Sequence, residues 1–220
     1  MSDTPTPSQP IDIKSFTLGP WQTNCYIVRL ADSPECWIVD AGFEPEPMIA
    51  CVKAEGLRPT RVILTHAHVD HIGGLSQIRA AFPECRVAIH ADEKAFLGSP
   101  DLNLSGWLEL PVTCSDADDL LADNERLTLA GTAEWVVFHT PGHSPGGITL
   151  YHEPSGIALV GDTLFAGSIG RYDFPTSNGQ QLFDSIGKRL LTLPDETQVF
   201  PGHGPPTTIG QERRTNPFLT

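Results

Sequence analysis

Apolar and polar residues alternate over several short stretches near the N-terminus, and this period of two predicts β-strands. Turn-forming residues separate the stretches, with Gly19-Pro20 after the first and Asp32-Ser33-Pro34 after the second. The spacing of apolar residues then changes to a helical period, back to a strand and again to a helix. The predicted elements are strands at Ile11–Leu18, Asn24–Leu30, Cys36–Asp40 and Arg61–Thr65, and helices at Glu46–Glu55 and His71–Phe82.

The second half of the chain repeats this arrangement of strands with helices attached. Because each sheet and helix must bury an apolar side, two such halves predict an α/β fold, a four-layer αββα sandwich. We expect one domain over residues 11–220, after a flexible, Pro- and Ser-rich tail over residues 1–10. The polar stretch Gly98–Asp119 gives no clear element. The predicted elements are strands at Arg86–His90, Arg126–Leu129, Glu134–His139, Gly147–His152, Ile157–Val160 and Thr197–Phe200, and helices near Asp92–Phe96 and Gln181–Leu191.

The composition of the chain argues against a membrane or a nucleic acid as its partner. Hydrophobic residues make up 40% of the chain and charged residues 19%, which is typical of a globular protein. There is no apolar run of about eighteen residues to span a bilayer and no signal-peptide pattern, so we expect a cytoplasmic protein without a membrane partner. A net charge of −13 argues against nucleic-acid binding. The 5 cysteines include no CxxC pair, which argues against a disulfide framework or a cysteine-based zinc site.

Four potential metal ligands lie in the segment His66-Ala67-His68-Val69-Asp70-His71. The segment follows the strand-like run ending at Leu64, so we expect its side chains on a loop at the carboxyl end of a strand. Imidazole nitrogens and carboxylate oxygens are ligands for zinc, iron or manganese. Four such groups in six positions predict a site for two ions rather than one. Asp70 can also cap the following helix, since a capping carboxylate keeps a second oxygen for a metal.

Three further candidate ligands, His143, Asp162 and His203, lie at the ends of predicted strands. Each follows an apolar run and a glycine, and glycine lets the backbone turn sharply where a side chain would collide with the ion. We therefore add these three side chains to the predicted metal site.

The remaining histidines, His90, His139 and His152, lack this context, and we expect them to be structural or surface residues. Asp40 closes the predicted strand Cys36–Asp40. Two roles stay open for it: capping the turn, or orienting a histidine that binds the metal.

The order HxHxDH, His, Asp, His resembles the pattern of the metallo-β-lactamase superfamily, from about Ile11 to the C-terminus. The resemblance implies the metallo-β-lactamase fold and two divalent ions, zinc in the first place, with iron and manganese as alternatives. It assigns His66, His68 and His143 to the first ion, and Asp70, His71 and His203 to the second. Asp162 would bridge the ions, Asp40 would orient a ligand, and Asp70 and Asp162 would be the catalytic carboxylates.

Within the superfamily the chain resembles the glyoxalase II group, the hydroxyacylglutathione hydrolases. The resemblance is carried by Thr23-Asn24-Cys25-Tyr26-Ile27-Val28, by the segment from Gly161 to Arg171 and by the stretch from Gly202 to Pro217. It implies that Arg171, with the neighbouring Tyr172, meets the substrate. Classical members continue into a helical C-terminal domain, and we expect this chain to be the short single-domain form.

The resemblance implies hydrolysis of a thioester, S-D-lactoylglutathione or a related S-acylated thiol, by a hydroxide that bridges two metals. The first alternative is a mononuclear iron persulfide dioxygenase, whose Gly-Arg-x-Asp-Phe stretch this chain shares at residues 170–174. A lactonase or β-lactamase and a non-catalytic metal-binding module are further alternatives. Each enzymatic reading predicts a small-molecule substrate, and the sequence does not specify the oligomeric state.

Overall fold

The computed structural model describes residues 10–108 and 111–219 of the chain. Its N-terminal half forms a six-stranded sheet with the order β1-β2-β3-β4-β5-β6. The first three strands pair antiparallel, and β3 to β6 pair parallel. The strands are β1 (Ile11–Leu18), β2 (Thr23–Leu30), β3 (Glu35–Val39), β4 (Arg58–Ile63), β5 (Arg86–His90) and β6 (Asp119–Leu121).

The C-terminal half forms a second six-stranded sheet with the order β14-β13-β10-β9-β8-β7. Its strands pair antiparallel except for β10 and β13, which pair parallel. A separate two-stranded hairpin, β11 with β12, follows β10. The strands are β7 (Arg126–Leu129), β8 (Ala133–His139), β9 (Ile148–His152), β10 (Ile157–Gly161), β11 (Leu164–Phe165), β12 (Ser168–Ile169), β13 (Gln198–Pro201) and β14 (Thr207–Thr208).

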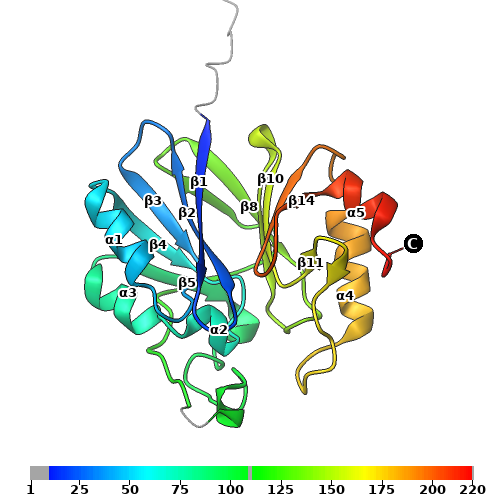
Figure 1. The fold of residues 1–220 in the computed structure, drawn as a ribbon, viewed down its shortest axis with the longest axis horizontal. Coiled ribbons are helices and arrows are strands. Elements are labelled where there is room, and N and C mark those ends of the chain that lie inside the picture. The colour runs from blue at the N-terminus through cyan, green and yellow to red at the C-terminus, as the bar shows by residue number, and fades with distance from the viewer. Residues whose placement is uncertain (1–9, 109–110, 220) are drawn as a thin grey trace, which may run out of the picture.

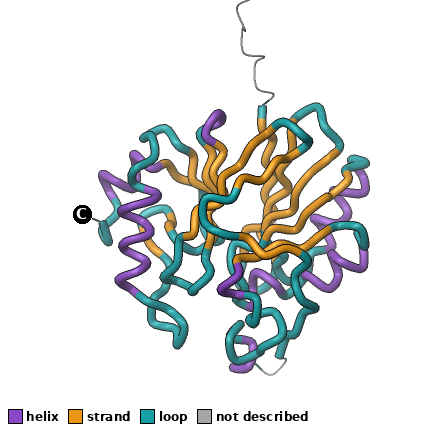
Figure 2. Tube along the Cα trace, turned by 180° about the vertical axis from the view of Figure 1, so that it is seen from behind, coloured by secondary structure: helices purple, strands orange, loops and turns teal. Residues whose placement is uncertain are grey.

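Helices cover the outer face of each sheet (Figures 1 and 2). The first sheet is covered on one side of the molecule and the second sheet on the other, which confirms the predicted four-layer αββα sandwich. The helices are α1 (Glu46–Ala54), α2 (Val69–Ile72), α3 (Leu75–Ala81), α4 (Gly179–Ser185) and α5 (Ile209–Thr215), with a π-helical turn η4 (Ile186–Leu190) and short 3-10 turns η1 (Ala91–Glu93), η2 (Ser105–Trp107) and η3 (Glu153–Ser155).

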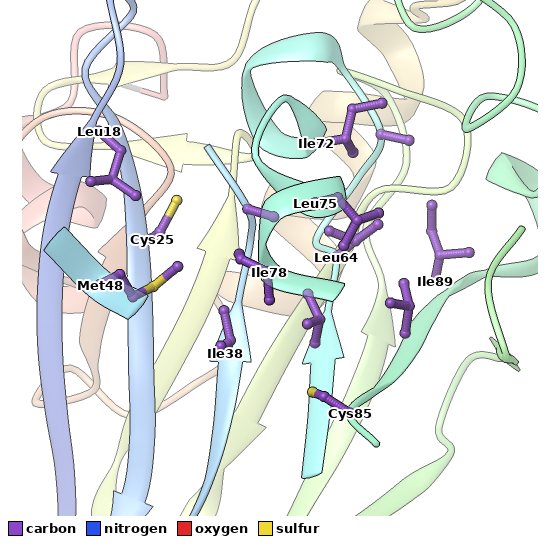
Figure 3. Close-up of a cluster of buried hydrophobic side chains, with 14 of the residues drawn as sticks. Leu18, Cys25, Ile38, Met48, Leu64, Ile72, Leu75, Ile78, Cys85 and Ile89 are labelled. Atoms are coloured by element: carbon purple, nitrogen blue, oxygen red, sulfur yellow. The ribbon is translucent and has the colours of Figure 1, made fainter. Parts of the chain in front are cut away.

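Three layers of apolar side chains hold these elements together. Between the sheets, Trp37 and Trp135 lie with ring centroids 6.2 Å apart, each almost fully buried. Outside the first sheet, Met48 and Ile78 of the helices pack on Ile38 of the sheet (Figure 3). A third cluster lies beneath α4, η4 and α5. Burial of one such large side chain stabilises the fold by about 1.5–3 kcal/mol, so the sheets are held firmly on both faces.

The predicted helix His71–Phe82 is wrong as a single element, because the chain breaks it at Gly73-Gly74 into α2 and α3. A Cβ atom on Gly74 would lie 2.1 Å from the carbonyl oxygen of Gly42, so the close approach of another loop requires glycine at the break. Helix α2 also begins at Val69, so Asp70 lies on a helical turn rather than on the predicted loop.

Other element boundaries differ from prediction by a few residues. The predicted helix Asp92–Phe96 is the shorter 3-10 turn η1, and the predicted helix Gln181–Leu191 divides into α4 and the π-turn η4. The strand predicted at Arg61–Thr65 is β4, which is shifted towards the N-terminus. Strands β6, β11, β12 and β14 and helix α5 were not predicted. The predicted N-terminal tail lies outside the described residues, except for Pro10.

Segments far apart in sequence come together at one edge of the sandwich. The carboxyl ends of five strands meet there, which are β3, β4, β8, β10 and β13. Parallel pairing of β3 with β4 and of β10 with β13 brings neighbouring strand ends to this edge. None of the described helices is long and apolar enough to cross a membrane.

Candidate metal centre

Seven histidine and aspartate side chains converge where the two sheets meet. The segment after β4 and the helical turn α2 supply four of them, and the turns after β8, β10 and β13 supply one each. All but His203 and Asp70 are buried. The structure therefore brings together every side chain of the predicted metal site, which are His66, His68, Asp70, His71, His143, Asp162 and His203.

Two of the groups of three that the converging atoms form share no residue, and a third, of His66, His71 and Asp162, overlaps them. The ligand atoms of His66, His68 and His143 lie within 4.8 Å of one another, and the same holds for Asp70, His71 and His203. In the first group, His68 Nδ1 is 2.9 Å from His143 Nε2. In the second, Asp70 Oδ2 is 3.0 Å from His203 Nε2 and 3.4 Å from His71 Nε2. These are the two sets that the resemblance to the metallo-β-lactamase superfamily assigned to two separate ions.

Asp162 lies between the two groups and faces both. Its Oδ1 is 3.4 Å from His71 Nε2, which belongs to the second group. Its Oδ2 is 3.5 Å from His143 Nε2 of the first group and 3.5 Å from His203 Nε2 of the second. A Cβ atom on Gly202 would lie 2.1 Å from Asp162 Oδ1, so glycine at this position leaves room for the carboxylate. The placement is the one that a bridging carboxylate needs.

Hydrogen bonds behind the histidines fix which ring nitrogen faces the centre. Asp40 Oδ2 accepts from His71 Nδ1 at 2.9 Å and also accepts from the Thr65 hydroxyl at 2.8 Å. Because that hydroxyl donates its proton to Asp40, it accepts from His66 Nδ1, which lies 3.2 Å away. In its neutral form, each of these two rings consequently turns an unprotonated Nε2 towards the centre.

Asp40 thus lies where it orients a histidine of the cluster, one of the two roles left open for it. Its backbone has a positive φ of 62°, an unusual conformation for a residue other than glycine, and its side chain is 1% exposed. His143 is oriented in a similar way, since its Nδ1 donates to the carbonyl oxygen of Arg171 at 2.8 Å.

Several of the inward-facing atoms have no hydrogen-bond partner within the protein. Nε2 of His66 and His71 and Oδ1 of Asp162 are buried without one. A buried polar atom without a partner is costly, and an array of lone pairs pointing at one another repels. A cation satisfies all of these atoms at once, so the residues present fit two bound metal ions.

The electrostatics of the protein alone favour neutral imidazoles in the first group. Burial lowers the pKa of His66 well below its usual range and lowers that of His68 to about 3. Burial also lowers the pKa of His143. For His71 the same desolvation is outweighed by the carboxylates of Asp70, Asp40 and Asp162, which raise its pKa. Neutral imidazole is the form that binds metals, so the first group is prepared for a cation.

A cleft of about 380 Å³ opens over the metal cluster. Its floor is made by polar side chains of the cluster, and its walls are mostly apolar. The walls include exposed indole rings: Trp21 is 44% exposed and Trp107 is 64% exposed. The lining residues are Trp21, His68, Val69, Asp70, Leu104, Trp107, Leu108, His143, Asp162, Phe165, Arg171, Phe174 and His203.

The family model of the metallo-beta-lactamase superfamily matches residues 18–203 of the chain. The chain belongs to this superfamily. Among its curated relatives, "Probable metallo-hydrolase YqgX" of Bacillus subtilis is 40% identical and covers 94% of this chain and 96% of its own. "Hydroxyacylglutathione hydrolase GloC" of Haemophilus influenzae is 34% identical and covers 95% of this chain and 98% of its own.

Two solved structures are similar to this one over nearly the whole chain. BLEG-1 B3 metallo-beta-lactamase is 43% identical, with a TM-score of 0.90, covering 95% of this chain and 100% of its own. TTHA1623, solved in a di-iron-bound form, is 40% identical, with a TM-score of 0.83, covering 94% of this chain and 100% of its own. The histidine and aspartate clusters of the present chain are consistent with a dinuclear site of this kind.

The predicted substrate-binding residues differ in their placement. Arg171 lines the cleft, but its guanidinium pairs with Asp173 in two hydrogen bonds, of 2.9 and 3.1 Å, and stacks over the ring of Phe174. Tyr172 does not line the cleft: its ring packs against Phe183, with centroids 5.9 Å apart. The structure therefore places Arg171 in the wall of the cleft above the metal cluster and leaves Tyr172 outside the cleft.

The histidines set aside in the sequence lie outside the seven-residue cluster. His90 and His139 stack with ring centroids 4.0 Å apart near Asp92. One ring nitrogen of each already has a partner, since His90 Nδ1 accepts from the amide of Asp92 and His139 Nε2 donates to the carbonyl oxygen of Pro145. His152 packs against Trp135 in the interior.

Sequence reasoning missed the apolar walls of the cleft and one buried acid, Glu93, behind the cluster. Trp107 lies in the stretch that gave no clear element. An exposed tryptophan in such a stretch was the available signal, because a large apolar side chain outside any periodic pattern often belongs to a binding surface.

Proposed function

We propose that the chain is a metal-dependent hydrolase that cleaves the thioester bond of an S-acylated thiol, S-D-lactoylglutathione or a related compound. The observation that carries the proposal is the set of seven converging side chains at the floor of an open cleft. A purely structural metal site is closed by its ligands, whereas a catalytic one keeps a position open to substrate.

The clustered side chains would hold two metal ions in separate positions. His66, His68 and His143 would hold the first ion, and Asp70, His71 and His203 the second, with zinc as the proposed metal and iron and manganese as alternatives. Two divalent ions here would supply hydroxide at neutral pH, because a shared water has its pKa lowered from 15.7 towards about 7. Asp162 fixes the spacing of the two positions.

Other side chains prepare the site for the reaction. Asp70 Oδ2 accepts from the Thr23 hydroxyl at 3.0 Å, which leaves its carboxylate held from two sides and oriented towards the cleft. Asp40 keeps the imidazole of His71 turned inwards. The apolar walls limit water around the scissile bond, which strengthens the electrostatic interactions at the floor.

The substrate class is supported by the 34% identical relative named a hydroxyacylglutathione hydrolase and by the position of Arg171 at the cleft. Arg171 would meet a carboxylate of the thiol part, although its pairing with Asp173 reduces the charge it offers. The apolar walls suit the uncharged part of a small-molecule substrate.

A β-lactamase is the second candidate, because the chain is 43% identical to a protein described as a B3 metallo-beta-lactamase. Both substrates present a carbonyl to the same floor. A mononuclear persulfide dioxygenase is less well supported, since it would give the clustered His71 and His203 no ligand role.

A substrate panel on one metal-loaded preparation tests the proposal. We expect S-D-lactoylglutathione and a neutral short-chain thioester to be hydrolysed with a kcat/KM at least tenfold above that for a chromogenic cephalosporin. Oxygen uptake with glutathione persulfide should stay at the background rate. Faster cleavage of the cephalosporin, or oxygen uptake at a rate matching thioester cleavage, would contradict the thioesterase assignment.

A further inference from the structure

Glu93 is a fully buried acid that the proposed reaction does not use. It lies in η1, just after β5, and is 0% exposed. Its partners are two backbone amides and a hydroxyl rather than a lysine or arginine: it accepts from the amides of Ala67 and Gly146 and from the hydroxyl of Ser144. Burial of a carboxylate without a cationic partner is costly, and desolvation raises the pKa of Glu93 to about 7.

The three donors belong to the two segments that carry the first group of histidines. Ala67 lies between His66 and His68, and its amide donates to Oε2 of Glu93. Ser144 follows His143, and the Ser144 hydroxyl and the Gly146 amide both donate to Oε1. One carboxylate therefore joins the segment from the first sheet to the turn from the second, with one oxygen committed to each.

The turn after His143 is shaped around this carboxylate. A Cβ atom on Gly146 would lie 2.7 Å from Glu93 Cγ and 3.1 Å from its amide nitrogen, so glycine is needed for the turn to reach the carboxylate. The carbonyl oxygen of Ser144 also accepts from the amide of Gly142 at 3.0 Å, which closes the turn around His143. The position of His143 thus depends on contacts that end at Glu93 as well as on its bond to the carbonyl oxygen of Arg171.

We propose that Glu93 is a positioning residue that sets the separation between the His66–His68 segment and His143, and so determines how tightly the three-histidine position holds its metal. The inference rests on the metal site of the proposed function, but not on the choice of thioester as substrate. Partners behind metal ligands typically change metal affinity roughly 10–100-fold when they are replaced.

The chain offers a matched control in Glu212. It is also a fully buried glutamate with three donors, since it accepts from the amide of Gly167, the hydroxyl of Thr207 and the side-chain amide of Asn216. Those donors carry none of the clustered histidines. Glu93→Gln and Glu212→Gln each replace one acceptor oxygen by a donor NH₂ group, so both should lower the Tm of the metal-free protein.

The deciding measurement is zinc affinity, obtained by competition with a metallochromic indicator for the wild type and both variants. It is repeated in a His203→Ala background, where the three-histidine position is expected to remain. We expect Glu93→Gln to weaken zinc binding there about tenfold or more and Glu212→Gln to leave it within about twofold. Equal affinities for the two variants would overturn the inference.

A milder variant keeps the test decisive if Glu93→Gln does not fold. Ser144→Ala removes one donor to Oε1 and leaves the carboxylate in place, so zinc binding should weaken by a smaller factor, about threefold to tenfold. Unchanged affinity in Ser144→Ala would then overturn the inference. A wild type that binds no zinc would overturn it together with the metal site, whereas zinc binding without thioester cleavage would overturn only the proposed substrate.

Discussion

The floor and the walls of the cleft are built in opposite ways. The floor is a cluster of buried, polar side chains held by hydrogen bonds such as the one between Asp40 and His71. The walls are apolar and partly exposed, with Trp107 64% exposed. The floor comes from strand ends of both sheets, whereas much of the wall comes from a single segment, Leu104–Leu108, between η1 and β6.

The wall segment is nevertheless held in a defined conformation. Leu104 has a positive φ of 67°, which costs about 1–2 kcal/mol for a residue other than glycine. The side chain of the buried Asn103 offsets this strain: it donates to the carbonyl oxygens of Phe96 and Val112, each at 3.0 Å, and accepts from the amide of Ser105. The backbone carbonyl oxygen of Asn103 accepts from the amide of Val69, beside the metal cluster. The wall is therefore tied to the floor, and we expect changes in the wall to alter substrate binding but not metal content.

The largest effect is expected at the floor, in Asp162→Ala. Removal of the carboxylate that faces both groups should lose one metal per chain and reduce hydrolysis on the order of 10³-fold, since several kcal/mol of transition-state stabilisation is lost. Elemental analysis with a thioester assay measures both. A mutant with two metals per chain and full activity would show that Asp162 does not bridge the ions.

The next largest effect is expected for substitution of the clustered histidines, which should lower metal content and kcat, whereas substitution of histidines outside the cluster should not. His68→Gln and His143→Gln should each lose metal and lower kcat about 100-fold, because glutamine supplies no imidazole lone pair at that position. His90→Gln and His152→Gln serve as controls and should keep metal content and turnover within about twofold of wild type. A loss of metal at His90 equal to that at His68 would mean that the stacked pair near Asp92 belongs to the metal site.

The same contrast explains what the sequence could predict. His143, Asp162 and His203 each follow an apolar run and a glycine, which is a local pattern, and the fold brings all three to the cluster. The break at Gly73-Gly74 depends on the carbonyl oxygen of Gly42, a tertiary contact that local spacing does not reveal. The stretch Gly98–Asp119 has no single apolar period because some of its apolar side chains, such as Trp107, line the cleft, whereas others, such as Val112, pack on the core outside the first sheet.

A smaller effect is expected at the wall, in Trp107→Ala. Loss of the indole should raise KM for a thioester with a bulky apolar acyl group about fivefold to tenfold, with metal content and kcat unchanged, because uniform binding is lost. Steady-state kinetics on phenylacetyl and acetyl thioesters of one neutral thiol measure it. Phe218→Ala is the matched control, since Phe218 is 47% exposed and does not line the cleft. An equal rise in KM for both variants would remove Trp107 from the binding surface.

The smallest effect is expected for Arg171→Ala. The guanidinium pairs with the exposed Asp173, so its loss should raise KM for a glutathione thioester only about twofold to fivefold and leave kcat little changed. A neutral short thioester should show no change. The backbone carbonyl oxygen that accepts from His143 is kept, so the metal content should also stay the same. Equal effects on both thioesters would exclude recognition of glutathione by this side chain.

Metal content measured beside activity tests the two-metal site most directly. The wild-type protein is stripped with a chelator, reloaded with zinc in steps and assayed for bound metal and thioester hydrolysis after each step. We expect hydrolysis to be absent without metal, to rise with loading and to reach its maximum at two ions per chain. Full hydrolysis in the stripped protein, or saturation of binding at one ion per chain, would contradict a dinuclear hydrolytic site built from the seven clustered side chains.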